Sequence, residues 1–149
     1  MSDGIMSISL DGITFKIRQE DYVDVTLSLN KARQSLKKKG FPLLEGVDKE
    51  DLVEKKDETD EQKEAREKLS FQVAEQSGLI SMTTAFYIMI ARIIEWSGVK
   101  VRGQIDPPCT EENKLVFFGK RYGLADKLMS AIQDREAEEE KNFEASPVG

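Results

Sequence analysis

The sequence predicts an α+β protein that is mostly α, with an N-terminal β-hairpin followed by a bundle of four to five helices. Two observations support this prediction. Apolar and polar residues alternate on both sides of an early Asp-Gly pair, which is the pattern of a hairpin. Beyond it, apolar residues recur every three or four positions, as they do in amphipathic helices. The expected helices cover about residues 19–39, 60–77, 81–96, 110–121 and 124–141.

The hairpin is expected over about residues 5–18, with its turn at Asp11-Gly12. Asp-Gly accepts the positive φ angles of a type I′ turn, whose twist matches that of the paired strands. An isolated two-stranded hairpin is only marginally stable, so its apolar face has to pack on the rest of the fold or on a neighbouring subunit. The apolar positions that define this face are Met6, Ile8, Leu10, Ile13, Phe15 and Ile17.

Residues 19–39 fit two patterns. Residues 23–29 alternate as a strand would, which leaves a third strand ending at Leu29 as the alternative. We favour a helix because the helical pattern is longer and ends at Gly40, a residue type suited to the position after a helix. The basic cluster at 37–39 then complements the helix dipole, or serves an acidic partner. The helical set is Tyr22, Val25, Leu29, Ala32 and Leu36.

Residues 45–58 are dense in Asp, Glu and Lys. Such a segment buries too little apolar surface to offset its ordering entropy, so we expect a flexible linker, with folding on a partner as the alternative. The expected organisation is therefore a hairpin plus helix, the linker, a helical domain and a disordered tail, with bounds 1–44, 45–58, 59–142 and 143–149.

The helix from residue 60 begins with a capping box, in which Thr59 and Gln62 bond each other's backbone amides. Gly78 is expected to stop or bend it. The next helix, 81–96, is apolar almost all round, so it must be covered on most sides. Its own chain is one source of that cover, and a second copy or a partner is the other.

Pro107 and Pro108 exclude a helix in the connector that follows. Thr110 is then expected to cap a helix that ends at Gly119 or Gly123. The last helix, from about Leu124, is expected to dissolve into a charged, solvated end over residues 134–144.

Composition excludes several classes of protein. The net charge is −6, and an acidic chain lacks the cationic contacts on which nucleic-acid binding depends. The longest apolar region, 80–96, is too short and too polar to span a membrane. No signal peptide is evident, and a single cysteine suits a reducing cytoplasm. We expect a soluble cytoplasmic protein with no nucleic-acid or membrane partner.

Catalytic equipment is also missing. The chain has no histidine, which removes the usual acid/base and the commonest transition-metal ligand. Cys109 precedes a helix N-terminus, which would lower its pKa somewhat, but we interpret it as a packing residue. The carboxylates at positions 48, 51, 57 and 60 lack the glycine and glutamate of a calcium loop. We therefore expect no enzyme, metal or cofactor, with an all-carboxylate metal site as the alternative.

Residues 94–142 carry a series of short motifs: Trp96-Ser97-Gly98-Val99, Gly103, Pro108-Cys109-Thr110-Glu111-Glu112-Asn113, Leu124-Ala125-Asp126, Ala131-Ile132 and Glu140-Lys141-Asn142. This series, about a third of the chain, resembles the tail assembly chaperones of long-tailed bacteriophages (siphophages) and prophages. Lys100-Val101-Arg102 departs from the acidic turn usual in that family. The N-terminal hairpin and the charged linker lie outside the resemblance.

The resemblance implies a protein that binds the phage tape measure protein in the bacterial cytoplasm and keeps it soluble until tail-tube protein polymerises around it. Such a protein needs apolar helical surface, and methionines let that surface adapt. A homo-oligomer fits the same role. The alternatives are a structural minor tail or connector protein of the virion and an acidic protein-binding regulator. The expected contact residues, each of which also reads as plain core, are Phe86, Met89, Ile90, Ile93, Phe117 and Phe118.

Overall fold

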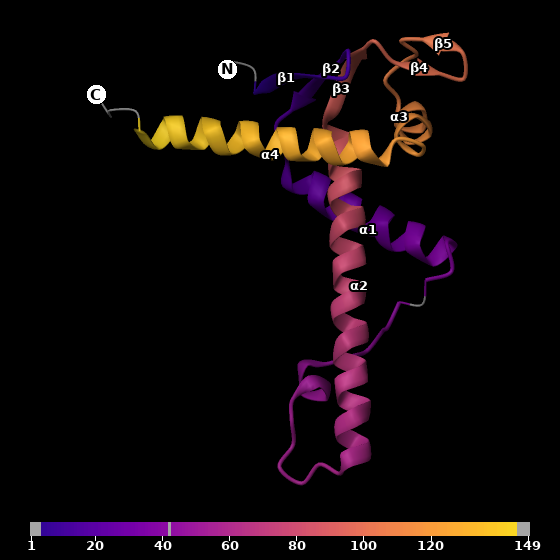
Figure 1. Ribbon diagram of the computed structural model, residues 1–149, viewed down its shortest axis with the longest axis vertical. Coiled ribbons are helices and arrows are strands. Elements are labelled where there is room, and N and C mark those ends of the chain that lie inside the picture. Colours follow the sequence, from indigo (N-terminus) through magenta and orange to yellow (C-terminus); the bar gives the residue numbers. More distant parts are fainter. Residues whose placement is uncertain (1–3, 42, 146–149) are drawn as a thin grey trace. The chain divides into compact units, whose positions relative to one another are not determined.

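The computed structural model describes residues 4–41 and 43–145, with the last three of these as backbone only (Figure 1). The predicted class, α+β and mostly α with an N-terminal hairpin, is confirmed. A short 3₁₀ helix, η1, lies in the charged segment. The elements in chain order are β1 (Ile5–Leu10), β2 (Ile13–Arg18), α1 (Tyr22–Lys38), η1 (Lys49–Leu52), α2 (Asp60–Arg92), β3 (Ile93–Ser97), β4 (Lys100–Val101), β5 (Gln104–Ile105), α3 (Glu111–Phe118) and α4 (Tyr122–Ala145).

The chain forms two compact units, residues 1–24 with 88–149 (unit 1) and residues 25–87 (unit 2). Unit 1 contains a three-stranded antiparallel sheet in the order β1-β2-β3. Because side chains alternate across a strand, one face of the sheet is apolar and the other polar. The polar face carries the Lys16–Glu95 ion pair at 3.0 Å. The buried apolar face consists of Met6, Ile8, Phe15, Ile17, Ile93 and Trp96.

Helices α3 and α4 supply the other half of the core of unit 1. Phe118 stacks on Phe15 with ring centroids 5.9 Å apart, and Phe117 meets the edge of Trp96 at 5.6 Å. Leu128 of α4 is fully buried. The apolar face of the hairpin therefore packs within its own chain.

Local signals in the sequence are confirmed at several element ends. Asp11 and Gly12 have φ angles of 52° and 80°, as a type I′ turn requires. The capping box forms, since Gln62 N donates to Thr59 Oγ1 at 3.1 Å and Thr59 N donates to Gln62 Oε1 at 3.0 Å. Gly40 ends α1 with a φ of 86°.

Residues 22–38 form a helix, so the helical prediction for this segment is confirmed and the alternative third strand is wrong. The buried face differs from the predicted one in the first two turns. Tyr22 and Val25 are exposed, whereas Asp24 and Ser28 are buried. The reason is an ion pair: the carboxylate of Asp24 receives hydrogen bonds from the guanidinium of Arg18, one of them at 2.8 Å.

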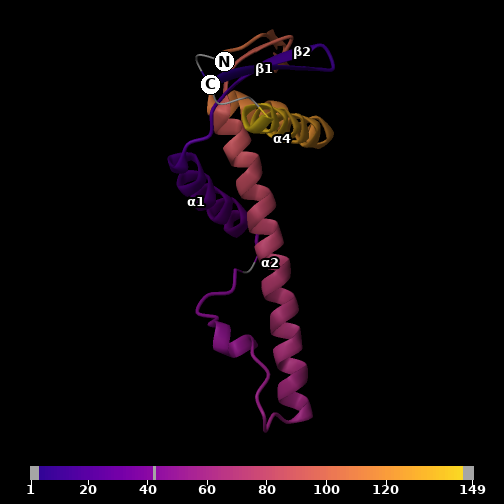
Figure 2. The same cartoon turned by 90° about the vertical axis from the view of Figure 1, so that its left-hand side faces the viewer.

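The two helices predicted at 60–77 and 81–96 are wrong in their bounds. They are one continuous helix, α2, visible as such in Figures 1 and 2. Gly78 keeps helical geometry, because a glycine inside a helix costs only about 1 kcal/mol relative to alanine and ends it only where the chain turns left-handed.

Helix α2 ends at Arg92, and the residues after it form β3 rather than the last turn of a helix. Ile93 pairs with Ile17, and Trp96 pairs with Phe15. The β-branched and aromatic residues suit a strand, and adding a third strand stabilises the hairpin. A register shift lies between Lys16 and Ile17, opposite the position of Ile94.

Two further expectations need correction. Residues 99–106, in the connector for which no regular element was predicted, form a second hairpin of β4 and β5, whose turn residues Arg102 and Gly103 have φ angles of 49° and 81°. The charged end expected to dissolve from Asp134 is helical to Ala145, because Glu, Lys, Ala and Arg favour helices. Of the predicted tail, residues 146–149 lie outside the described part of the chain.

The Arg18–Asp24 ion pair makes stability depend on pH. Hydrogen bonds from Arg18 hold the pKa of Asp24 below its usual value. A lowered folded-state pKa stabilises the fold fully above the unfolded value of about 4, and this contribution is lost as pH falls below it. We expect Asp24→Asn to cost about 1–2 kcal/mol at pH 7 and less at pH 3, as measured by urea unfolding. An equal cost at both pH values would contradict this assignment.

Candidate protein-binding site

The six predicted contact residues do not form an exposed surface. Phe86 is half-buried, and the other five are at most 2% exposed. The burial of these five supports their reading as core in this conformation, and a contact role for them or for the half-buried Phe86 stays a prediction. Periodicity identified an apolar helix face but could not show what covers it. The five buried residues are Met89, Ile90, Ile93, Phe117 and Phe118.

Within unit 2, one face of α2 is covered by the chain itself. Gln76 lies on this face, and its Oε1 accepts a hydrogen bond from Leu44 N at 2.6 Å. Leu44 and Gln76 line both of two hollows of about 290 and 380 Å³. The smaller hollow is mainly apolar, with Leu36, Phe41, Leu43 and Leu79 among its lining residues.

The other face of α2 in unit 2 is open. Phe71 is 71% exposed and Met82 is 72% exposed. Gly78 follows Phe71 by seven residues and precedes Met82 by four, and these spacings place all three residues on one side of the helix. A Cβ atom built at Gly78 would meet nothing within 4 Å. We call Phe71, Gly78 and Met82 the α2 stripe.

Charged side chains border the α2 stripe at the end occupied by Phe71, whereas residues 76–91 of the helix carry no charge. At 100° per residue, five exposed charged positions lie within about 60° of Phe71 around the helix. Four are acidic and one is basic, so this end of the stripe is negative. The stripe therefore combines bulky apolar groups, a gap at a glycine and an acidic border. The border residues are Asp60, Glu64, Glu67, Lys68 and Glu75.

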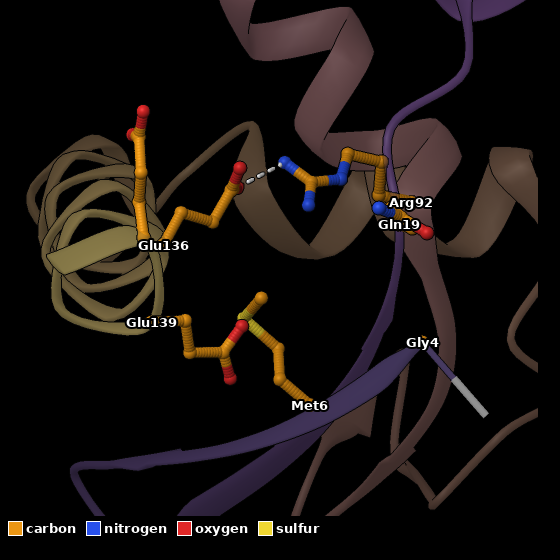
Figure 3. A pocket seen from close by; sticks show the side chains of 7 residues that line it. Gly4, Met6, Gln19, Arg92, Glu136 and Glu139 are labelled. Atoms are coloured by element: carbon orange, nitrogen blue, oxygen red, sulfur yellow. Dashed lines mark ion pairs between the residues drawn. The ribbon is translucent and has the colours of Figure 1, made fainter. Parts of the chain in front are cut away.

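Unit 1 has a polar hollow of about 550 Å³ (Figure 3). Arg92, the last residue of α2, is 5% exposed and has two partners there. Its Nη1 pairs with Glu136 Oε1 at 2.9 Å, and its Nε donates to the carbonyl of Arg18 at 2.9 Å. Met6 and Glu139 also line the hollow. Because Arg92 is already neutralised, its geometry is that of a structural tie between α4 and the sheet.

Two features bear on the chemistry that the sequence left open, the carboxylates and Cys109. No group of three or more His, Cys, Asp or Glu side chains in them is arranged to hold a metal ion. Cys109 is half-buried, and its Sγ approaches the carbonyl of Ile93 at 3.8 Å. Burial raises the pKa of this thiol, the reverse of the lowering expected from the helix N-terminus, and so makes it less nucleophilic.

The first motifs of the family resemblance build a corner of unit 1, which we call the Trp96 corner (residues 96–113), and its remaining motifs lie on α4. Trp96 Nε1 donates to the carbonyl of Pro107 at 2.8 Å. Val99 N donates to Asp106 Oδ1 at 2.9 Å, and Asp106 N donates back to Val99 O at 2.7 Å. Thr110 caps α3 as predicted, accepting from Asn113 N at 3.2 Å. These residues hold the fold of the corner together.

Comparison of the chain with protein-family models, with curated proteins and with solved structures finds no match. Among the described residues, no helix is long and apolar enough to cross a membrane. The fold and the site thus define an α+β protein whose most distinctive open feature is the α2 stripe.

Proposed function

We propose that this chain is a non-enzymatic tail assembly chaperone of a long-tailed phage or prophage, acting during virion morphogenesis in the bacterial cytoplasm. Its α2 stripe binds an apolar helical segment of the tape measure protein and releases it when tail-tube protein polymerises. The observation that carries the proposal is the exposure of Phe71 and Met82 on one side of a helix whose other side is covered.

The stripe has the spacing of one side of a helix–helix contact, with two apolar anchors and a glycine on one face. Fully burying a Phe or Met side chain contributes about 1.5–3 kcal/mol, so two anchors support binding that is specific yet reversible. Gly78 has no side chain, and the space above it lets a partner helix approach closely. The acidic border favours a partner segment with Lys or Arg beside its apolar face.

The family resemblance supports the proposal from a different part of the chain. It covers the Trp96 corner and motifs of α4 in unit 1, whereas the α2 stripe belongs to unit 2. The resemblance therefore bears on the kind of protein, and the stripe on the place where a partner binds. Neither depends on the other.

The proposal is tested by the double variant Phe71→Ala/Met82→Ala. We expect it to bind apolar helical segments of a tape measure protein about 10- to 100-fold more weakly than the wild type, because truncating two central anchors costs about 1.4–3 kcal/mol. Isothermal titration calorimetry with soluble tape measure segments measures this. Val53→Ala, an exposed apolar position away from the stripe, is the control. Unchanged affinity of the double variant would overturn the proposal.

A structural minor tail or connector protein is the second candidate. The uncharged edge strand β1 favours it, because such an edge can join the sheet of another virion protein. Mass spectrometry of purified particles separates the two. A chaperone is absent from finished virions, whereas a connector is present in a fixed number of copies.

A further inference from the structure

Strand β1 is an edge of the three-stranded sheet. The two-residue turn makes Leu10 and Ile13 a hydrogen-bonded pair, so hydrogen-bonded and non-hydrogen-bonded pairs alternate from there along β1. The backbone groups of Ile5, Ser7 and Ser9 consequently point away from β2. Within the described residues these groups make no hydrogen bond.

The two edges of the sheet differ in how they are protected. Proteins commonly block an edge strand with charges, proline or a bulge. Strand β3 has a charged residue, Glu95, and a register shift beside it. Strand β1, with the sequence Ile-Met-Ser-Ile-Ser-Leu, has no charge and no proline, and it pairs with β2 without a shift. It therefore remains a template for another strand.

We propose that β1 pairs antiparallel with β1 of a second copy of this chain, which joins two three-stranded sheets into one of six strands. The two-fold axis passes through Ser7, so that each Ser7 lies opposite its equivalent and Met6 lies opposite Ile8 of the second copy. This register continues the buried face across the junction. A slip of one residue would place apolar side chains on the polar face.

The charges and the face pattern select a second copy as the occupant. The residues on both sides of Ser7, Met6 and Ile8, are apolar and face the core, so the strand has the same pattern in both directions. No charged side chain of β1 meets its equivalent across the junction. The nearest cation, Lys16 on β2, is already paired with Glu95 at 3.0 Å. The dimer lies on unit 1 and is independent of the proposed chaperone role of the α2 stripe.

Cysteine cross-linking tests the register in the full-length chain, with Cys109→Ser as the background. Ser7→Cys should give a disulfide-linked dimer on mild oxidation, because hydrogen-bonded antiparallel partners have Cα atoms about 5.5 Å apart, within disulfide range. Ser9→Cys is the matched control on the same exposed face. In the proposed register the two Ser9 positions are four residues apart along the strands, about 13 Å. A disulfide cannot span that distance.

We expect at least ten times more cross-linked dimer from Ser7→Cys than from Ser9→Cys. Equal yields from the two variants would overturn the proposal. If the Ser7→Cys variant instead formed a disulfide with a different protein, the partner of the β1 edge would not be a second copy. That result would also overturn the proposal.

A second measurement does not depend on oxidation. Ser7→Pro removes an outward N–H, and proline is tolerated on an edge strand where that N–H is not needed for the sheet. We expect it to weaken dimerisation at least tenfold in sedimentation equilibrium, whereas Ser7→Ala, which keeps the N–H, should dimerise like the wild type. A wild type that stays monomeric at about 100 µM, or a Ser7→Pro variant as dimeric as the wild type, would overturn the proposal.

Discussion

Phe118→Ala is expected to lower the free energy of unfolding by about 4 kcal/mol, the largest effect of any single truncation considered. Phe118 is fully buried, stacks on Phe15 and meets Phe117 edge to face with centroids 5.0 Å apart. Removing a buried Phe ring costs about 3–5 kcal/mol, because both transfer free energy and packing are lost. Urea unfolding followed by fluorescence of the single tryptophan, Trp96, measures this, since Trp96 packs on Phe117.

Phe71→Ala is the matched control for this prediction. It removes the same side chain from a position that is 71% exposed. Surface substitutions away from special features change stability by about 0.5 kcal/mol or less. A cost below about 1 kcal/mol for Phe118→Ala, or equal costs for the two variants, would show that Phe118 is not core. The two variants also distinguish the core of unit 1 from the α2 stripe, because only Phe71→Ala should weaken partner binding.

Gly98→Ala is expected to cost about 3 kcal/mol. Gly98 has a φ of +83°, a left-handed conformation that costs an L-residue about 1–2 kcal/mol. A Cβ at this position would also lie 2.6 Å from the carbonyl oxygen of Gly12 in the first hairpin turn. That oxygen belongs to the backbone and cannot move aside without distorting the turn. The same urea titration measures the loss.

Gly103→Ala controls for the backbone conformation. Gly103 has nearly the same φ, +81°, but a Cβ there would meet nothing within 4 Å. We expect a cost of about 1 kcal/mol, so the difference between the two variants isolates the close approach of Gly98 to Gly12. If the two substitutions lower the free energy of unfolding equally, the contact between the Trp96 corner and the hairpin turn does not contribute to stability.

This contact explains one residue of the family resemblance physically. The glycine of Trp96-Ser97-Gly98-Val99 is required where the chain leaves β3 and passes the first hairpin turn. Trp96 of β3 packs against Phe117 of α3, and its indole N–H donates to the carbonyl of Pro107. The motif thus describes how a sheet and a helix are joined.

Local chemistry let the sequence determine several elements correctly. The turn at Asp11-Gly12, the capping box at Thr59, the cap at Thr110 and the helix end at Gly40 each depend on residues a few positions apart. Helix α1 was also predictable, because its pattern extends beyond the stretch that could be read as a strand. The class of the fold followed from these elements.

Tertiary structure alone decided the rest. Ile93 and Trp96 continue a helical pattern, and only the presence of β2 as a pairing partner makes them a strand. Gly78 stays helical because nothing nearby requires a turn there. Phe86, Met89, Ile90 and Ile93 among the predicted contact residues look like the α2 stripe in sequence, since both sets recur at helical spacing. Periodicity specifies which residues share a face, whereas burial depends on what the distant parts of the chain place against that face.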